Sequence, residues 1–399
     1  MKSMLSYKEA LTALFSEIKI NKPEYIKTTD SMGYVLAEDI KSTIDLPQAN
    51  NSSMDGYAFK FKSLKNNSIE VLKKEAKAGD KIKNISIKYG VQIYTGGILP
   101  ENFDTVIEIE RTKIEKNILY IDCNIEKGRN VRYKGEDVEA GQTILKKGTL
   151  ITYLNFSLLL NSNLKEIKVY KKPSIGIVST GNELKKPGSK IMPHHVIDSN
   201  SYVIKSYFQE LGLEKIKNYR VKDSIEETKN ILKTALEDNN IIITIGGVSM
   251  GNFDFIRPSL KALKCKKIFW KIAIKPGRPF GFFKYKNKNI FTLPGNPVSS
   301  LVCSRLFIKN AIFKMIGRTD IQNEFLNAKL ECSIKKSNDR TIFLRGIYKE
   351  HNGVYYVCPT GTIQNSNILT ELADSNCLIE VPANSGPFSK NNIIRILKF

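Results

Sequence analysis

A glycine-containing loop after residue 245 carries side chains that suit the binding of an anion. Residues 241–245, IIITI, form a short β-branched apolar run, which is typical of a strand buried on both faces. The loop that follows supplies Gly246, Gly247, Ser249 and Gly251, and then Asp254. A strand, a glycine turn and a helix start together form a backbone that can wrap an anion, with a hydroxyl and a carboxylate beside it. Most loops of this kind are plain turns, so this loop alone is weak evidence for a ligand.

A second loop, residues 294–299, has the sequence of a helix start that can bind an oxyanion. Asn296 suits the N-cap, and Pro297 suits the first helical turn, where its missing N–H costs nothing. The N–H groups of residues 298–300 are then expected to point outward at the positive end of the helix dipole. An ordinary well-capped helix remains the alternative. The candidate ligand contacts in this loop are Pro294, Gly295, Asn296, Pro297 and Ser299.

Both loops belong to a repeated pattern of strands and helices between residues 173 and 318. Strand-like apolar runs alternate with helical periodicity, which predicts a doubly wound, mostly parallel sheet. Ligands of such sheets bind outside the carboxyl ends of the strands. The expected strands are 175–178, 216–221, 241–245, 268–273 and 290–293, and the expected helices are 201–211, 225–237, 255–263 and 298–316.

The residues that follow the other expected strands add charge to the same edge of the sheet. The first strand is followed by Ser179, Thr180, Gly181 and Glu183, and the second by Asp223. The fourth strand carries Lys271 and is followed by Lys275, Pro276, Gly277 and Arg278. Carboxylates that face cations suit Mg²⁺-assisted phosphoanhydride chemistry, because the metal bridges acidic side chains and phosphate oxygens while Lys and Arg neutralise developing charge.

Two other chemistries do not fit these loops. No Lys follows the glycines in Walker spacing, so a P-loop triphosphatase is not indicated. The three histidines lie outside the loops, which argues against a Ser-His-Asp triad.

The remaining chain predicts further domains around this α/β domain. A helical pattern near the N-terminus cannot bury its apolar face alone, short strands separated by Gly, Pro and Asn follow it, and a β pattern returns at the C-terminus. The C-terminal part is expected to be a β barrel or sandwich. The expected domains are a discontinuous N-terminal α+β domain (1–45 plus 138–172), a β-rich insertion (46–137), the α/β domain (173–318) and the C-terminal β domain (319–399).

Composition indicates a globular, multidomain protein of 399 residues with a net charge of +22. The charge is compatible with an anionic partner, but the lysines are spread along the chain without a long basic run, so a Lys-rich composition explains it better. The six cysteines have neither disulfide-framework nor zinc spacing. No signal peptide or spanning segment is apparent, so a cytoplasmic protein is expected.

The loops, taken together, resemble the molybdopterin molybdenumtransferases, the MoeA family that includes the E domain of gephyrin. The resemblance extends over nearly the whole chain, in the family's order. Its motifs are Ser53–Ala58, Thr95-Gly96, Asn130–Arg132, Gly135–Asp137, Ser179–Leu184, Asp198–Asn200, Gly246–Gly251 with Asp254, Lys275–Pro279 and Leu293–Pro297. Asn182 stands where the family usually has Asp, and Arg278 where Lys is common.

The resemblance implies an activity: Mg²⁺- and molybdate-dependent cleavage of adenylylated molybdopterin, with molybdenum transferred to the dithiolene and AMP released. It also implies an elongated homodimer, which works with a molybdopterin adenylyltransferase. In the family model, Asp55 and Thr95 enter the partner subunit's site. The resemblance also implies that Glu183, Asp223 and Asp254 bind the ligand and the metal ion. The residues implied to bind phosphate or molybdate are Lys271, Lys275, Ser299, Arg345 and Ser366.

Two other functions remain open at this stage. A non-catalytic molybdopterin-binding scaffold of the same fold is possible, since the gephyrin member also clusters receptors. Nucleic-acid binding driven by the net charge is the other. No aromatic-basic RNA motif or recognition helix is apparent, so a nucleic acid is not expected as a partner. No segment reaches spanning length, so a membrane is not expected either.

Overall fold

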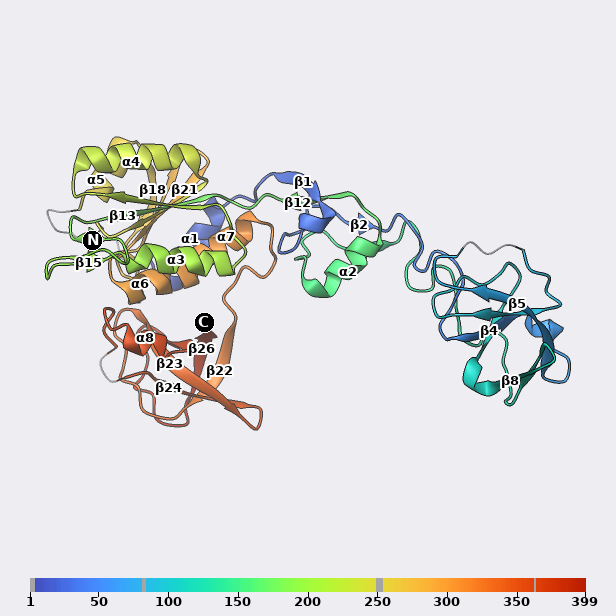
Figure 1. Cartoon of the computed structure of the whole chain (residues 1–399). Helices are drawn as coiled ribbons and strands as arrows, with labels where there is room; N and C mark the ends of the chain where they lie inside the picture. The colour runs from blue at the N-terminus through green and yellow to red at the C-terminus, as the bar shows by residue number, and fades with distance from the viewer. Residues whose placement is uncertain (1–3, 81–83, 249–253, 362–363) are drawn as a thin grey trace. The chain divides into compact units, whose positions relative to one another are not determined.

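The computed structural model describes residues 4–80, 84–248, 254–361 and 364–399. The chain divides into two compact units, one made of residues 25–169 and the other of residues 1–24 with 170–399 (Figure 1). Within the described ranges, no helix is long and apolar enough to cross a membrane.

The larger unit is built on a six-stranded sheet with the order β16-β13-β17-β21-β20-β18. β16, β13, β17 and β21 are parallel neighbours, and β20 pairs antiparallel with both β21 and β18. β18 therefore runs in the same direction as the four parallel strands. The strands are β13 (Ile175–Thr180), β16 (Ile216–Val221), β17 (Ile241–Ile245), β18 (Lys266–Trp270), β20 (Gly281–Tyr285) and β21 (Lys288–Leu293).

Helices cover both faces of this sheet. Figure 1 shows α4 and α5 on one face and α3 and α6 on the other. β17 contributes to the apolar core on each face of the sheet, because its successive residues Ile242 and Ile243 point to opposite faces and are fully buried. The helices are α1 (Tyr7–Glu17), α3 (Ser199–Glu210), α4 (Ile225–Asp238), α5 (Ile256–Ala262), α6 (Pro297–Cys303) and α7 (Lys309–Met315), with a π-helical turn at Ser304–Ile308 joining the last two.

The sheet is mixed: five of its six strands run in one direction, as expected, and β20, which was not expected, runs against them. Its residues, GFFKY, are aromatic and strand-like, and a short turn at Lys286 and Asn287 joins them to β21. The expected strand 268–273 is β18, which begins and ends earlier. The expected helix 298–316 is present, with the π turn in its middle.

The N-terminal helix α1 packs into the core of the α/β body. Ser6 and Glu9 form a reciprocal capping box that fixes its start. Ala10 and Leu14 are fully buried in the same cluster as Ile272 of the α/β body. The helix therefore lies on the α/β side of the division between the two units. The other domain limits remain predictions.

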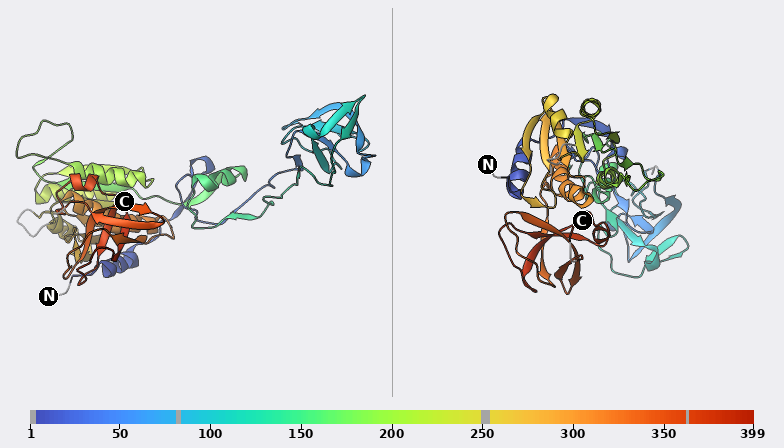
Figure 2. Two further views of the ribbon diagram at one scale, coloured as in Figure 1. Left: turned by 90° about the horizontal axis from the view of Figure 1, so that it is seen from below. Right: turned by 90° about the vertical axis from the view of Figure 1, so that its left-hand side faces the viewer.

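The C-terminal strands, red in Figure 2, close into a barrel. Pairing runs β23-β24-β22-β26-β25 and back to β23, so no edge is left in the ring. The short β19 (Ile274–Lys275) adds to β23 from the α/β side. The elements are β22 (Phe325–Leu330), β23 (Thr341–His351), β24 (Val354–Pro359), α8 (Thr370–Ala373), β25 (Cys377–Val381) and β26 (Ile393–Lys398).

The second unit contains a curled β domain and a smaller α+β part. The β domain has a six-stranded sheet with the order β7-β4-β6-β5-β9-β8. Its strands are β4 (Gly56–Phe59), β5 (Ser68–Ala76), β6 (Gly90–Ile93), β7 (Thr105–Glu108), β8 (Thr112–Glu115) and β9 (Ile118–Ile121), with the pair β3 (Asn51–Ser52) and β10 (Val131–Arg132). The smaller part contains β1 (Pro23–Lys27), β2 (Ile40–Lys41), β11 (Thr143–Leu145), α2 (Tyr153–Asn161) and β12 (Glu166–Tyr170).

Candidate functional site

The carboxyl ends of β13, β16, β17 and β21 border a hollow of about 700 Å³, here called the carboxyl-end hollow. Ile245 is in register with Ser179 on one side and Leu293 on the other, so three strands end at one level. The hollow therefore lies where ligands of such sheets bind. The residues expected from the sequence that line it are Ser179, Thr180, Gly181, Glu183, Asp223, Gly246, Gly247, Pro294, Gly295, Asn296 and Pro297.

Asp223 is held in place across two neighbouring parallel strands. The hydroxyl of Thr180 donates to its Oδ1 (3.1 Å), and the N–H of Asn182 donates to its Oδ2 (3.3 Å). The N–H of Asp223 donates in turn to Oδ1 of Asn182 (3.2 Å). Ser179, at the end of β13, has a buried hydroxyl that makes no hydrogen bond within the described part of the chain. Since a buried hydroxyl normally has a partner, this one suits a ligand.

The turn after β13 brings Glu183 close to the backbone of Gly181. Gly181 has φ of +150°, and a Cβ atom there would lie 2.5 Å from Oε2 of Glu183. A side chain at position 181 would therefore displace this carboxylate. Glu183 is exposed and lines the hollow together with Asp223.

The start of α6 has the expected N-cap and proline, but two of the N–H groups expected to be free donate to backbone carbonyls. Asn296 occupies the N-cap and Pro297 the first helical position. The N–H of Val298, however, donates to the carbonyl of Ser366 (3.3 Å), and that of Ser300 to the carbonyl of Asn296 (3.0 Å). The expectation of three outward amides is therefore wrong for residues 298 and 300. The side chain of Asn296 donates to Oγ of Ser366 (2.9 Å), which places that serine at the helix start.

A second cluster, around Trp270, contains two of the expected residues. Asp254 is nearly buried and lies 3.5 Å from the guanidinium of Arg257. Burial raises the pKa of the Asp254 carboxyl, although Arg257 opposes the shift. Arg257 stacks on the Trp270 ring at 3.7 Å, and Nζ of Lys271 lies 4.4 Å from the centre of the same ring. Trp270 thus connects the carboxylate to the lysine.

The loop from Lys275 to Pro279 packs against α6. Gly277 has φ of +108°, and its carbonyl lies 3.7 Å from Sγ of Cys303, so a side chain there would collide with that sulfur. Lys275 and Arg278 are exposed, and Pro279 lines the carboxyl-end hollow. Two cations therefore stand on a rigid loop whose end reaches the hollow, and Pro276 lies between them in sequence.

Arg345, on β23, is almost fully buried and is paired within the barrel. Its guanidinium pairs with Glu371 and donates to the carbonyl of Asn365 (2.8 Å), while its backbone N–H donates to the side chain of Gln364 (2.8 Å). Arg345 thus fixes the segment that carries Ser366. A direct contact between Arg345 and a ligand stays a prediction.

In the second unit, Asp55 and Thr95 lie together as the sequence suggested. The N–H and the hydroxyl of Thr95 both donate to Oδ1 of Asp55. These hydrogen bonds, the backbone one first, hold the pKa of Asp55 below its usual range. The carboxylate is exposed and stays ionised.

Some expected residues cannot be placed, and some lining residues were not expected. Ser249 and Gly251 lie outside the described residues. The carboxyl-end hollow is also lined by Asp198, Ser199 and Asn200, whose last member donates to the carbonyl of Gly295 (2.6 Å). They lie at the start of α3 and not after a strand of the sheet, so only their family motif could have indicated them. Arg257 and Trp270 had no signal beyond their residue types.

The architecture and the site define a class: a multidomain α/β protein whose parallel strands present carboxylates, a buried hydroxyl and glycine turns to one ligand hollow. Three family models match the chain: the MoeA N-terminal region (domains I and II) at residues 5–162, a probable molybdopterin binding domain at 176–314, and the MoeA C-terminal region (domain IV) at 327–399. The chain belongs to the MoeA family of molybdopterin molybdenumtransferases. It is a transferase of molybdenum cofactor synthesis.

Full-length relatives support this assignment. The molybdopterin molybdenumtransferase of Haemophilus influenzae is 30% identical over 401 residues, covering 99% of both chains, and that of Staphylococcus aureus strain COL is 29% identical, covering 98% of this chain and 94% of the relative. Two crystal structures of a MoeA protein from Pyrococcus horikoshii have the same fold. Their TM-scores are 0.83 at 24% identity, with 99% of each chain covered, and 0.79 at 27% identity, with 100% of each covered.

Proposed function

We propose that the carboxyl-end hollow binds adenylylated molybdopterin and that the chain inserts molybdate into it with release of AMP. The observation that supports this most directly is the convergence of carboxylates, glycine turns and a buried hydroxyl at the ends of adjacent strands. The family's name describes the same transfer. The phosphate-facing part of the hollow would be Gly246, Gly247 and the start of α6, where backbone and not side chain approaches the ligand.

The described carboxylates fit a magnesium ion. No group of three or more His, Cys, Asp or Glu side chains gathers around a common point in the described ranges. Mg²⁺, however, usually takes only one or two protein carboxylates and completes its shell with phosphates and water. Asp223 and Glu183 line one hollow, and Asp254 carries a carboxyl whose pKa is raised by burial, so that a cation would stabilise its charged form. When bound, Mg²⁺ would neutralise charge on the phosphoanhydride oxygens.

The chain's own side chains would then position and neutralise the substrate. Thr180 and Asn182 hold the carboxylate of Asp223 in one orientation, which removes the need to order it during the reaction. Lys271, Lys275 and Arg278 supply positive charge for the leaving AMP phosphate and for molybdate. Ser299 and Ser366 would contribute polar groups at the helix start.

We further propose a homodimer in which Asp55 and Thr95 complete the site of the other subunit. Both residues are exposed, and two hydrogen bonds from Thr95 fix the exposed carboxylate of Asp55. A cytoplasmic location and delivery of the substrate by a molybdopterin adenylyltransferase complete the proposal.

Reconstitution tests the reaction. Purified protein with Mg²⁺, molybdate and adenylylated molybdopterin is expected to release AMP and to activate an apo-molybdoenzyme. Lys275→Ala should lower turnover by at least about a hundredfold, as expected for the loss of a charge that stabilises the transition state. Its circular dichroism and melting temperature should not change. Stoichiometric binding without AMP release would contradict the proposal and indicate a scaffold.

A further inference from the structure

A second hollow, of about 1030 Å³, lies at the opposite end of the same sheet. It is bordered by the residues that precede β13, β16 and β18, by the turn between β20 and β21, and by the chain after α1. These are the amino ends of strands whose carboxyl ends surround the candidate active site. The second hollow, here called the amino-end hollow, is therefore separate from that site.

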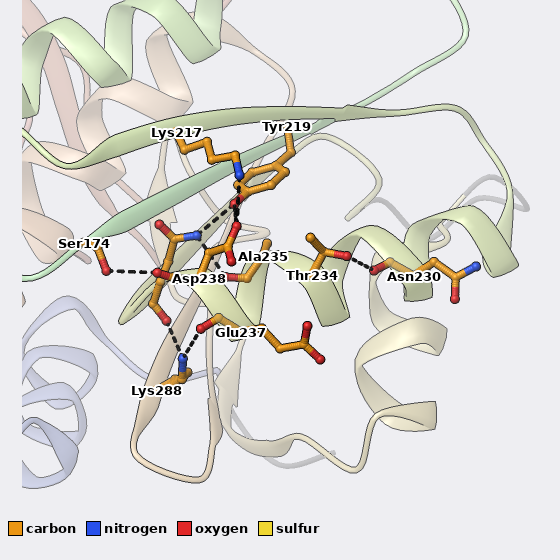
Figure 3. Close-up of polar contacts among 10 residues, drawn as sticks. Ser174, Lys217, Tyr219, Asn230, Thr234, Ala235, Glu237, Asp238 and Lys288 are labelled. Carbon is orange, nitrogen blue, oxygen red and sulfur yellow. Dashed lines mark hydrogen bonds and ion pairs between the residues drawn. The ribbon is translucent and has the colours of Figure 1, made fainter.

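The amino-end hollow is strongly basic. Nine of the residues that line it are lysines, and two are acidic, Glu17 and Asp238. Glu17 already pairs with Lys266 (3.0 Å). Figure 3 shows Asp238 at the end of α4 facing Lys217 and Tyr219, and both distances are 2.9 Å. Both carboxylates are therefore engaged. Of the other lining lysines, Lys171 pairs with Glu24 (3.8 Å) and Lys172 lies near Glu214, yet the described lining keeps an excess of positive charge.

Two of these lysines are partly buried in the wall of the hollow. Lys172 and Lys284 are half-buried, and burial lowers the pKa of each. Glu214 opposes this shift at Lys172 and Glu17 opposes it at Lys284, where the nearby Lys19 and Lys266 add to it. Lys284 donates to the backbone carbonyl of Glu17 (2.7 Å), which fixes its direction. A partly dehydrated ammonium group is stabilised by an anion that enters the hollow.

A buried amide lies among the lysines. Asn289 is 2% exposed and lines the hollow, yet among the described residues its side-chain carbonyl has no hydrogen-bond partner. Its NH₂ contacts a weakly accepting sulfur, Sδ of Met315, at 3.5 Å. Buried amides normally satisfy both ends. This amide is therefore an unsatisfied polar group in the wall of the hollow.

The residue types that line the hollow restrict the class of ligand that it can bind. Among the described lining residues there is no arginine and no aromatic side chain, so neither bidentate forks nor stacking platforms for bases are present. Lysines act as point charges with three donors each. The size of the hollow is that of a small-molecule site. Lysines set in its wall can be reached by a small anion but not by a flat acidic protein surface.

We propose that the amino-end hollow is a binding site for a small, multiply charged phosphate anion of the pyrophosphate or short polyphosphate class. This inference does not depend on the transferase reaction. It gives a role to part of the +22 net charge that the candidate active site does not use.

Calorimetric titration of the full chain with tripolyphosphate, at about 0.15 M salt to screen surface charge, tests the proposal. One ion is expected to bind per chain. The double variant Lys264→Gln/Lys286→Gln removes two exposed lysines of the hollow and should weaken binding by about tenfold or more. The matched control Lys229→Gln/Lys233→Gln removes two exposed lysines of α4 that do not line the hollow, and should bind like the wild type.

Three outcomes would overturn the proposal. Equal weakening in both double variants would mean that net charge alone attracts the anion. Loss of binding in Lys275→Ala would place the ion in the candidate active site. Tighter binding of a random DNA duplex than of tripolyphosphate, lost in Lys264→Gln/Lys286→Gln, would assign the hollow to nucleic acid. Normal transferase turnover of the hollow variant would show that its fold is intact, so a loss of ion binding would report on the hollow itself.

Discussion

Thr95 donates two hydrogen bonds to one carboxylate oxygen of Asp55, from its N–H and from its hydroxyl, each 2.7 Å long. The backbone of Gly56, next to Asp55, packs directly against the carbonyl oxygen of Ile107, which a Cβ atom at position 56 would overlap. An exposed acid is thus ionised and oriented without any buried partner. This arrangement costs side-chain freedom and contributes little stability on a surface, which suits a group that acts on a ligand.

The first prediction concerns Asp55 and tests the shared site. Asp55→Ala should lose turnover with little change in melting temperature, because the side chain is exposed. If Asp55 acts in the other subunit's site, refolding a mixture of Asp55→Ala and Lys275→Ala chains creates mixed dimers with one intact site. Random pairing then restores on the order of a quarter of wild-type turnover.

The control for this experiment is each variant refolded alone, which should stay inactive. No recovery in the mixture, with dimers shown by light scattering, would place Asp55 in its own subunit's site. Recovery from a monomeric mixture would argue against the shared-site arrangement altogether.

The second prediction follows from the raised pKa of Asp254. Since the folded pKa lies above that of the unfolded chain, the protonated carboxyl favours folding at low pH, and this contribution is lost as the pH rises through the folded pKa. At pH 7 the folded protein therefore carries a desolvated charge. Asp254→Asn should raise the free energy of unfolding at pH 7, and the gain should shrink toward pH 4, while turnover falls by at least about a hundredfold.

Urea unfolding between pH 4 and pH 7 measures this effect. Added Mg²⁺ should stabilise the wild type more than Asp254→Asn if the carboxylate helps to hold the ion. A variant that is less stable than the wild type at pH 7 would mean that the contact with Arg257 outweighs the burial of the charge.

The third prediction uses two glycines of one connection. Gly181→Ala places a methyl group where the Glu183 carboxylate now lies, and so should shift that carboxylate and lower turnover by about tenfold or more, in the range of lost positioning. Gly188→Ala is the matched control, because Gly188 also has positive φ (+80°) but has no atom within 4 Å of a Cβ. Both should lose about 1 kcal/mol of stability from backbone strain. Equal turnover in the two variants would remove Glu183 from the reaction.

The sequence predicted the sheet and its ligand edge because both depend on local patterns. β16 and β17 begin and end as expected, since apolar runs and turn residues delimit them. β20 was missed because its partner, β18, lies at the sheet edge, and antiparallel pairing there interrupts the alternation of strand and helix. Pairing between distant segments has no local signature of this kind.

The limits of the site prediction have the same origin. The loops after strands are recognisable from glycine and capping residues, so Gly246 and Asn296 were found. The carbonyl of Ser366 accepts a hydrogen bond from the N–H of Val298, although the two residues are 68 positions apart in the sequence. No sequence pattern near residue 298 predicts this contact. Arg257 of α5 stacks on Trp270 of β18 only in the folded chain, and neither residue marks the contact in the sequence. These contacts needed the structure.

The last prediction separates structure from ligand binding at Arg345. Arg345→Met removes one member of a buried ion pair and leaves Glu371 without its partner, which should cost about 3–5 kcal/mol of unfolding free energy. Arg345→Met/Glu371→Leu removes both charges and should recover most of that loss, because an apolar pair avoids the desolvation penalty. Urea unfolding measures both variants, and turnover of the stable double variant then decides the role. Lost turnover at restored stability supports a part in the site through Ser366, whereas normal turnover limits Arg345 to holding the barrel together.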